Sequence, residues 1–294
     1  MPGVPRAENP AGVVLEADVM TSPRRRRSWT KPYRFARWMV ADAWPYLAWP
    51  ELASPRNLWL CWRVCGYTQQ NMAGLVNVIS LAERADRAGV GGAFVECGVW
   101  RGGCAGVMAH LANSTGRRVW LFDSFEGMPE ASAQDVGDAA HALTLGRKEG
   151  RLVPVGTNVA ALEDVRDLLH RQLRVSRDVV EIRKGWFQDT VWRARAEIGP
   201  IALLRLDGDW YESTKTCLEA LYDRVEDGGF VIIDDYGTFP GCRTAVDEFL
   251  ASRGLDVDIH TVDYTRVYFQ KPVSESGNGF ADRSTRAAGA HRSP

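Results

Sequence analysis

The feature that most constrains the fold is an alternation, from about residue 70 onward, between short apolar runs and longer stretches of helical periodicity. Apolar residues recur at helical spacing ahead of the first run and between the later runs. We expect strands at residues 93–97, 119–122, 179–182, 201–206, 230–233 and 267–270. Strands separated by helices indicate a mostly parallel sheet with both faces covered, so the sequence predicts an α/β fold.

Composition excludes several classes of protein. The 294 residues include 36 basic and 37 acidic side chains and are 45% hydrophobic, which is typical of one large domain with extensions. The formal net charge is -1, so the protein as a whole has no positive potential that would attract a polyanion. A dedicated nucleic-acid binder is therefore not expected. No run reaches the roughly 18 apolar residues of a membrane span, and the N-terminus lacks the pattern of a signal peptide. Six cysteines without a C-x-x-C pair favour reduced thiols and a cytoplasmic location.

Three segments lie outside the regular alternation. Residues 1–23 and 272–294 show no period, and we expect both to be disordered. Residues 24–66 form a basic, Trp-rich segment, here called the arm, which we expect to be helical, divided into short pieces by Pro45 and Pro50, and packed on the main domain or a second subunit. Contact with anionic lipid and a substrate lid are the alternatives. The tryptophans of the arm are Trp29, Trp38, Trp44, Trp49, Trp59 and Trp62.

Ligands of parallel sheets bind beyond the carboxyl ends of the strands, so the residues that follow each run are candidates for a site. A glycine-rich turn, residues 96–104, follows the first run; it does not end in Gly-Lys-Ser/Thr, which disfavours a P-loop nucleotide hydrolase. Asp123 follows the second run, where an acid can accept the hydroxyls of a ribose, or simply cap a turn. Turn and acid together favour an adenosine-like ligand.

Four acids follow the later runs. Asp207 and Asp209 come after residues 201–206, and Asp234 and Asp235 come after residues 230–233. If these strands are neighbours, Asp207, Asp234 and Asp235 converge, and their mutual repulsion is relieved by a hard divalent ion such as Mg²⁺. The alternative is that the acids pair with Arg205 or Lys215, or cap helices. A zinc site is disfavoured because no His or Cys lies at ligand spacing.

Five ordered motifs identify a family. They are residues 94–103 (FVECGVWRGG), 123–129 (DSFEGMP), 185–190 (GWFQDT), 206–214 (LDGDWYEST) and 233–237 (IDDYG) with 240–242 (PGC). In these motifs the chain, from about Tyr67 to Lys271, resembles the macrocin O-methyltransferases, which methylate sugar hydroxyls with S-adenosylmethionine and Mg²⁺. The resemblance implies a Rossmann-like class I methyltransferase fold over residues 67–271, with a mostly parallel seven-stranded sheet and helices on both faces.

The resemblance also implies roles for individual residues. The glycine turn would hold the methionine part of the cofactor, Asp123 and Ser124 its ribose, and Trp186 its adenine, while Tyr67 and Thr68 match a pair that lines the same pocket. The full implied cofactor set is Tyr67, Thr68, Glu96, Gly98, Trp100, Arg101, Gly102, Asp123, Ser124, Phe125 and Trp186. The implied metal ligands are Asp207, Asp234 and Asp235.

The expected reaction is transfer of a methyl group to an aligned hydroxyl oxygen whose proton a carboxylate accepts. We expect Asp207 to be both metal ligand and base, with Asp209 and His141 as further candidates for the base. Trp210 replaces the lysine that catechol-methylating relatives carry, which disfavours a catechol.

The expected acceptor is a glycosylated small molecule: a macrolide or aminocoumarin deoxysugar, or a cell-envelope glycan. A non-sugar phenolic or polyketide hydroxyl, metal-dependent hydrolysis, and a non-catalytic cofactor-binding scaffold are the alternatives. By analogy with relatives we expect a homodimer or higher homo-oligomer, and the basic arm makes peripheral contact with a membrane a further hypothesis.

Overall fold

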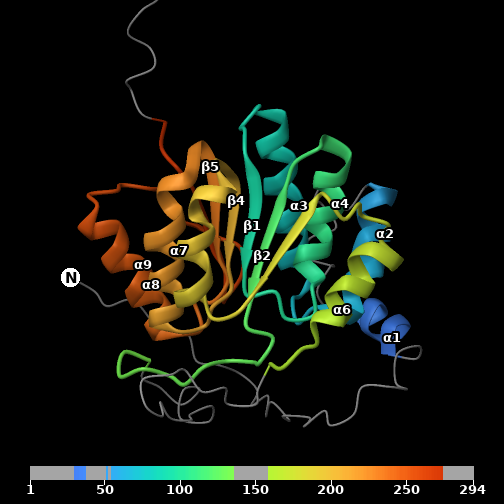
Figure 1. Ribbon diagram of the computed structural model, residues 1–294, viewed down its shortest axis with the longest axis horizontal. Coiled ribbons are helices and arrows are strands. Elements are labelled where there is room, and N and C mark those ends of the chain that lie inside the picture. Colours follow the sequence, from blue (N-terminus) through green and yellow to red (C-terminus); the bar gives the residue numbers. More distant parts are fainter. Residues whose placement is uncertain (1–29, 38–50, 52–53, 136–157, 274–294) are drawn as a thin grey trace, which may run out of the picture.

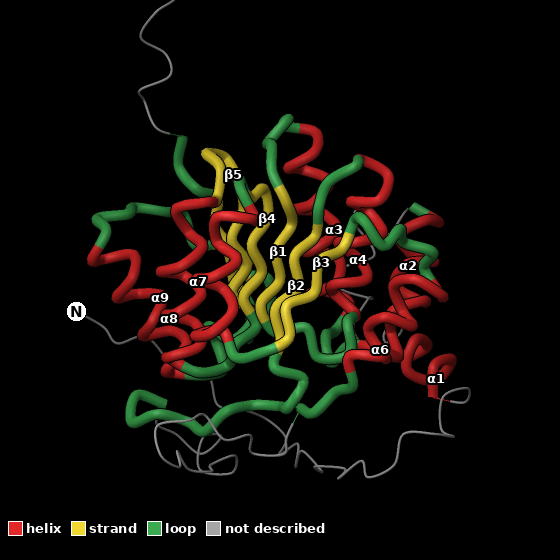
Figure 2. The backbone as a smooth tube through the Cα atoms, viewed as in Figure 1, coloured by secondary structure: helices red, strands yellow, loops and turns green. Residues whose placement is uncertain are grey.

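A computed structural model describes residues 30–37, 51, 54–135 and 158–273. These residues form a seven-stranded sheet in the order β3-β2-β1-β4-β5-β7-β6. Its strands are β1 (Ala93–Cys97), β2 (Val119–Asp123), β3 (Val180–Lys184), β4 (Ile201–Leu206), β5 (Val225–Ile233), β6 (His260–Thr261) and β7 (Val267–Gln270). The five strands from β3 to β5 run parallel, and β7 is antiparallel to both β5 and β6. Figure 2 shows the strands of the sheet side by side, with helices on either side of them.

This architecture confirms the predicted Rossmann-like class I fold. Each of the six expected runs lies in a strand, with ends shifted by a residue or two except at β5, which begins at Val225. The early part of β5 was missed because Glu226 and Asp227 are exposed and break the apolar pattern. The sequence did not predict β6 either, because both of its residues are exposed and carry no burial signal.

Helices cover both faces of the sheet, as expected (Figure 1). On one face lie α2 (Pro55–Val64), α3 (Met72–Arg87), α4 (Gly103–Thr115) and α6 (Leu162–Arg166), which continues into the π-helical turn η5 (Asp167–Gln172). On the other face lie α7 (Phe187–Ile198), α8 (Tyr211–Leu221) and α9 (Pro240–Ser252). Single 3₁₀ turns, η4 (Cys65–Tyr67) and η6 (Tyr222–Arg224), follow α2 and α8.

Alternation along the buried strands builds two apolar clusters. In β1, Phe94 packs into the cluster with α3 and α4, whereas Val95 packs into the cluster with α7 and α8. The same alternation places Leu121 and Phe122 of β2 on opposite faces. Because both faces are buried, the strands read as continuous apolar runs, which is the pattern that made them recognisable in the sequence.

The described part of the arm packs on the domain. Helix α1 (Thr30–Arg37) contributes Phe35, whose ring meets that of Trp62 edge-on at 5.0 Å. Helix α2 buries Leu60 and Val64 in the same cluster as α3 and α4. The ring of Trp59 stays partly exposed.

Several expectations lie outside the described residues. These are the disordered ends at 1–23 and 272–294, apart from residues 272 and 273 of the tail, the candidate base His141, and the arm residues Trp29, Trp38, Trp44 and Trp49. In the described part of the chain, no helix combines the length and apolarity needed to cross a bilayer.

The carboxyl ends of β1 and β4 approach each other closely. The amide of Asp207 donates to the carbonyl of Cys97 at 2.8 Å, and Gly98 follows with φ of 93°. A Cβ atom at position 98 would lie 1.8 Å from the carbonyl oxygen of Asp207. Glycine is therefore required where the turn after β1 passes the end of β4.

We expect Gly98→Ala to destabilise the fold by at least about 3 kcal/mol, because it adds a backbone clash to a left-handed conformation. The matched control is Gly116→Ala at the end of α4, where φ is 72° but no atom lies within 4 Å of the added Cβ. That control should lose only about 1 kcal/mol. Urea unfolding of both variants measures the difference, and equal losses would contradict the role assigned to Gly98.

Candidate active site

A cavity of about 530 Å³ opens at the carboxyl ends of β1, β2, β4 and β5. Twelve of the residues predicted for the cofactor, the metal or the base lie in its lining. They are Tyr67, Thr68, Glu96, Gly98, Trp100, Asp123, Ser124, Trp186, Asp207, Asp209, Asp234 and Asp235. Residues from the first and last thirds of the predicted domain thus meet in one pocket.

Three predicted cofactor residues lie beside the pocket and not in its lining. Arg101 forms an ion pair with Asp164 at 3.1 Å and stacks over the ring of Tyr67. Gly102 is the left-handed cap that starts α4, and Phe125 is buried in the apolar core. Each of them contacts a residue of the lining: Arg101 contacts Tyr67, the amide of Gly102 donates to Val99, and the amide of Phe125 donates to Asp123.

The carboxylate of Asp123 holds two loops together at the ends of β1 and β2. One oxygen accepts from the amides of Val99 and Trp100 at 2.7 and 2.8 Å, and the other accepts from the amide of Phe125 at 2.6 Å. Burial raises the pKa of this carboxyl, while the three backbone N–H groups lower it. The turn-capping alternative is thus realised, and the lone pairs that these bonds leave free remain open for a ligand.

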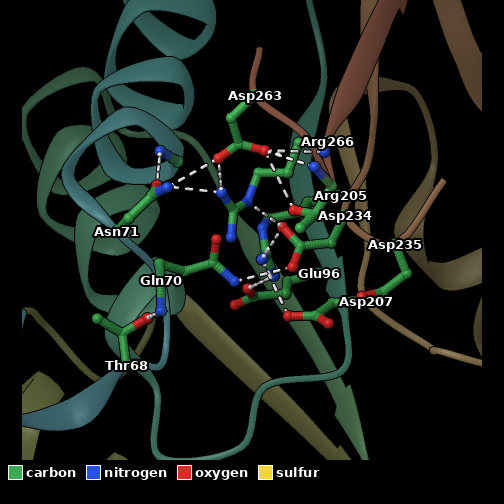
Figure 3. A network of polar contacts seen from close by, with 12 residues as sticks. Thr68, Gln70, Asn71, Glu96, Arg205, Asp207, Asp234, Asp235, Asp263 and Arg266 are labelled. Atoms are coloured by element: carbon green, nitrogen blue, oxygen red, sulfur yellow. Dashed lines mark hydrogen bonds and ion pairs between the residues drawn. The ribbon is translucent and has the colours of Figure 1, made fainter. Parts of the chain in front are cut away.

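Arg205, at the end of β4, is the centre of the buried charge network in Figure 3. Its guanidinium donates to Glu96 at 2.7 Å, to Asp207 at 2.9 Å and to Asp234 at 2.8 Å. The side chain is 2% exposed. Pairing of the acids with Arg205, which the sequence left open as an alternative to a metal site, is therefore observed. Lys215, the other cation considered, instead donates to the hydroxyl of Tyr211.

A second arginine extends the network toward the end of the chain (Figure 3). Arg266 donates from Nε to Asp234 at 2.8 Å and also pairs with Asp263. Asn71, which caps α3 by accepting from the amide of Gly74, donates to Asp263 at 2.9 Å. Neither Arg266 nor Asp263 lies in a recognised motif, so no feature of the sequence pointed to them.

Two residues of the lining, Gln70 and Glu96, each have a buried acceptor atom without a hydrogen-bond partner among the described residues. Gln70 donates to Asp234 at 2.9 Å, yet its Oε1 accepts nothing, and Oε2 of Glu96 is likewise unpaired. Unsatisfied buried polar atoms are costly, so such atoms in a pocket lining indicate where a ligand donates hydrogen bonds. Gln70 adjoins the recognised Tyr67-Thr68 pair, which is the one signal that could have drawn attention to it.

The three predicted metal ligands meet as expected. One oxygen of each of Asp207, Asp234 and Asp235 lies within 4.8 Å of the other two. Burial, followed by repulsion from Asp234, raises the pKa of Asp207 to about 6, and burial and neighbouring carboxylates raise that of Asp235. Burial acts to raise the pKa of Asp234 as well, but Arg205 and Arg266 hold it below its ordinary value.

This donor set fits a hard divalent cation. It consists of carboxylate oxygens only, which is the set that Mg²⁺ prefers. Asp234 already accepts from Gln70 and from both arginines, whereas Asp207 accepts one hydrogen bond from Arg205 and Asp235 one from the amide of Asp209. The repulsion that remains at Asp207 and Asp235 is what a bound cation would relieve.

Fold and site together define a class I methyltransferase, and comparisons with known proteins give its family. The sequence model of the macrocin-O-methyltransferase family matches residues 37–271. The 8-demethyl-8-(2,3-dimethoxy-alpha-L-rhamnosyl)-tetracenomycin-C 4'-O-methyltransferase of Streptomyces olivaceus is 40% identical over 228 residues, 76% of this chain and 83% of that protein. Demethyldecarbamoylnovobiocin O-methyltransferase of Streptomyces niveus is 35% identical over 223 residues, 74% of this chain and 80% of that protein.

A solved structure agrees with these relatives. The O-methyltransferase NovP is 34% identical, with a TM-score of 0.61 over 70% of this chain and 83% of that one. The chain therefore belongs to the macrocin O-methyltransferase family and is an S-adenosylmethionine-dependent O-methyltransferase. The family match also begins 30 residues ahead of Tyr67, where the recognised motifs start.

We expect Arg205→Met to destabilise the protein by about 3–5 kcal/mol, because it leaves several buried carboxyl groups without their cation. The control is Arg166→Met, which removes an exposed ion pair with Glu163 at 3.7 Å and should cost less than about 1 kcal/mol. Chemical denaturation measures both, and a loss as small as that of the control would contradict the central role of Arg205.

Glu96 should make stability depend on pH. Burial raises its pKa in the folded protein from 4.5 to about 8, so between these values the folded state binds more protons than the unfolded state. Its contribution to stability is therefore lost as the pH rises through this window. The free energy of unfolding of the wild type relative to Glu96→Gln, measured without metal, should fall from pH 5 to pH 8. A difference that is independent of pH would contradict the raised pKa.

Proposed function

We propose that this enzyme transfers the methyl group of S-adenosylmethionine to a hydroxyl of a sugar carried by a small molecule, with Mg²⁺ at the carboxylate cluster. The observation that carries the proposal is the meeting of Asp207, Asp234 and Asp235 in the same pocket as the cofactor residues. The names of the two relatives, one of which mentions a rhamnosyl group, favour a glycosylated acceptor.

The cofactor would occupy the side of the pocket formed by β1 and β2. There, the carboxylate of Asp123 and the hydroxyl of Ser124 suit the ribose, and Trp186, at the start of α7, suits the adenine. The unpaired Oε2 of Glu96 suits the ammonium group of the methionine part. Tyr67, Thr68, Gly98 and Trp100 complete this part of the lining.

The metal would be held by Asp207 and Asp235, with Asp234 oriented by Arg205 and Arg266. A bound Mg²⁺ supplies Lewis acidity that lowers the pKa of an acceptor hydroxyl. Asp207 would then accept the hydroxyl proton, because it is a carboxylate of the same cluster and lies in the lining of the pocket.

The reaction balances without a further reactant. The bond between the sulfonium sulfur and the methyl carbon breaks, a bond between that carbon and the acceptor oxygen forms, and the hydroxyl proton passes to the base. S-adenosylhomocysteine leaves as a neutral thioether. Alignment of the methyl group with the oxygen is the main contribution that the pocket makes to the rate.

Asp209 lies in the lining with φ of 58° and is a further candidate for the base.

Trp210 is buried, and its indole N–H donates to the carbonyl of Pro129 at 2.8 Å. Trp210 therefore supports the loop that contains Pro129, whereas catechol-methylating relatives carry a lysine at this position. A sugar hydroxyl is therefore favoured over a catechol. The homo-oligomeric state and a membrane contact of the arm stay predictions.

Asp123→Ala should weaken the binding of S-adenosylhomocysteine at least about tenfold, because it removes the predicted ribose acceptor and releases the turn after β1. Isothermal titration measures this loss. The exposed Asp256→Ala variant is the control and should bind as the wild type does. Equal binding by Asp123→Ala and the control would contradict the cofactor assignment.

Asp235→Asn should reduce turnover at least about 100-fold while the affinity for S-adenosylhomocysteine changes less than about threefold. Methyl transfer is followed by mass spectrometry with the 4-nitrophenyl glycosides of L-rhamnose, L-fucose and D-glucose as acceptors. EDTA should abolish wild-type turnover and Mg²⁺ should restore it. Full activity in EDTA would exclude the metal from the mechanism.

A further inference from the structure

Helix α6 continues into the π-helical turn η5, whose side chains reach residues of the pocket lining. Both elements pack on the face of the sheet that α2 and α4 cover (Figure 1). In η5 the amide of Leu173 donates to the carbonyl of Leu168, five residues earlier, at 2.9 Å. Single turns of this kind are rare, and they occur frequently at functional sites.

The π-helical geometry brings two side chains to one hydroxyl group. Residues five apart in a regular α-helix lie about 140° apart around its axis, so Asp167 and Gln172 would point in different directions. In η5 they meet, because Nε2 of Gln172 donates to Oδ2 of Asp167 at 2.7 Å and also to the hydroxyl of Tyr67. That hydroxyl donates to the same carboxylate oxygen at 3.4 Å and is therefore both donor and acceptor.

The position of Tyr67 matters because this residue lines the pocket and lies against the first turn of α4. A Cβ atom at Gly103 would lie 2.3 Å from Cβ of Thr68 and 2.9 Å from the carbonyl oxygen of Tyr67. Tyr67 is only 2% exposed, so its hydroxyl depends on partners within the protein. A displacement of Tyr67 would therefore change both the lining and the start of α4.

A second connection joins α6 to the same part of the lining through Arg101. Nε of Arg101 pairs with Asp164 of α6 at 3.1 Å, and the guanidinium lies over the rings of Tyr67 and Trp100 at 5.4 and 5.5 Å. Trp100 has φ of 48°, a conformation that persists in a non-glycine residue only where the surroundings fix it. Arg101 thus links α6 to two aromatic residues of the lining.

The two elements are held in place from both sides. Val165 of α6 lies against the turn after β1, where a Cβ atom at Gly102 would come within 3.2 Å of its side chain. On the side of the arm, Arg63 of α2 donates to the carbonyl of Gln172 at 2.6 Å. Helix α6 and η5 are therefore fixed between α2 and the glycine-rich turn, directly behind the lining.

We propose that Asp167 and Gln172 are positioning residues for S-adenosylmethionine, which act through the hydroxyl of Tyr67. Together with the pair of Asp164 and Arg101, they order this part of the lining before the cofactor binds. A lining that is already ordered loses little conformational entropy on binding, which raises the affinity for the cofactor. The inference rests on the proposed function only for the place of the cofactor, and it assumes nothing about the acceptor or the metal.

The test measures the binding of S-adenosylhomocysteine to the full chain by isothermal titration, without metal or acceptor. Gln172→Leu and Asp167→Ala should each raise the dissociation constant about 5- to 10-fold, because each removes a hydrogen bond that holds Tyr67. The matched control is Arg171→Ala, which removes only the ion pair that Asp167 makes with a 79% exposed side chain. This control should change the dissociation constant less than about twofold.

A double-mutant cycle tests whether Gln172 acts through Tyr67. Tyr67→Phe keeps the ring over Arg101 and should by itself raise the dissociation constant about 5- to 10-fold. Adding Gln172→Leu should then raise it less than about twofold further, because the shared hydroxyl is already absent. Additive losses would show that Gln172 acts by another route and would overturn the inference.

A merely structural role for η5 would lower stability or the folded fraction without a specific effect on the cofactor. With a 4-nitrophenyl glycoside as acceptor, Gln172→Leu should raise the KM for S-adenosylmethionine about 5- to 10-fold and keep kcat within about twofold of the wild type. Urea unfolding measures the stability of the same samples. A fall in kcat with an unchanged KM would overturn the inference.

The outcomes separate this inference from the proposed function. If Gln172→Leu and Asp167→Ala bind S-adenosylhomocysteine as the wild type does, while Asp123→Ala binds it weakly, the inference fails and the proposed function stands. If Asp123→Ala also binds as the wild type does, the cofactor does not lie at this part of the lining, and both fail.

Discussion

The site depends on one buried cation. Arg205 is almost inaccessible to water and neutralises acids that come from β1, β4 and β5, the three central strands of the sheet. Without this guanidinium, the carboxyl ends of these strands would carry carboxylates in a region of low dielectric, where each would be driven to take up a proton. Arg205 also leaves Asp207 and Asp235 less neutralised than Asp234, and the proposed metal site rests on this difference.

The two sides of the pocket are built by different physical means. At the ends of β1 and β2, backbone N–H groups of the turn after β1 converge on Asp123, so a single carboxylate orders a glycine-containing loop. At the ends of β4 and β5, order comes from charged side chains, from Arg205 through Asp234 and Arg266 to Asp263. The first arrangement depends on backbone groups, whereas the second depends on the particular side chains present in this chain.

The sequence was sufficient for the fold class, for the central strands and for the residues that meet in the pocket. This success has a physical basis, because doubly buried strands produce apolar runs and because functional residues follow strand ends. The partners of these residues were not predictable. Arg266 and Asp234 are 32 positions apart and Gln70 and Asp234 are 164 apart, and nothing local in the sequence relates them. The exposed strand β6 shows the same limit, because its pairing with β7 depends on tertiary packing.

The turn at residues 263–266 combines an anchored backbone with an exposed side chain, that of Tyr264. Its backbone is held by Asp263 and its neighbours, while the side chain of Tyr264 takes no part in that anchoring and projects into solvent. An exposed side chain on an anchored backbone can be replaced with little change in the free energy of unfolding, because few contacts are lost. In evolutionary terms, the surface beside the pocket can therefore vary at this position without compensating mutations elsewhere in the fold.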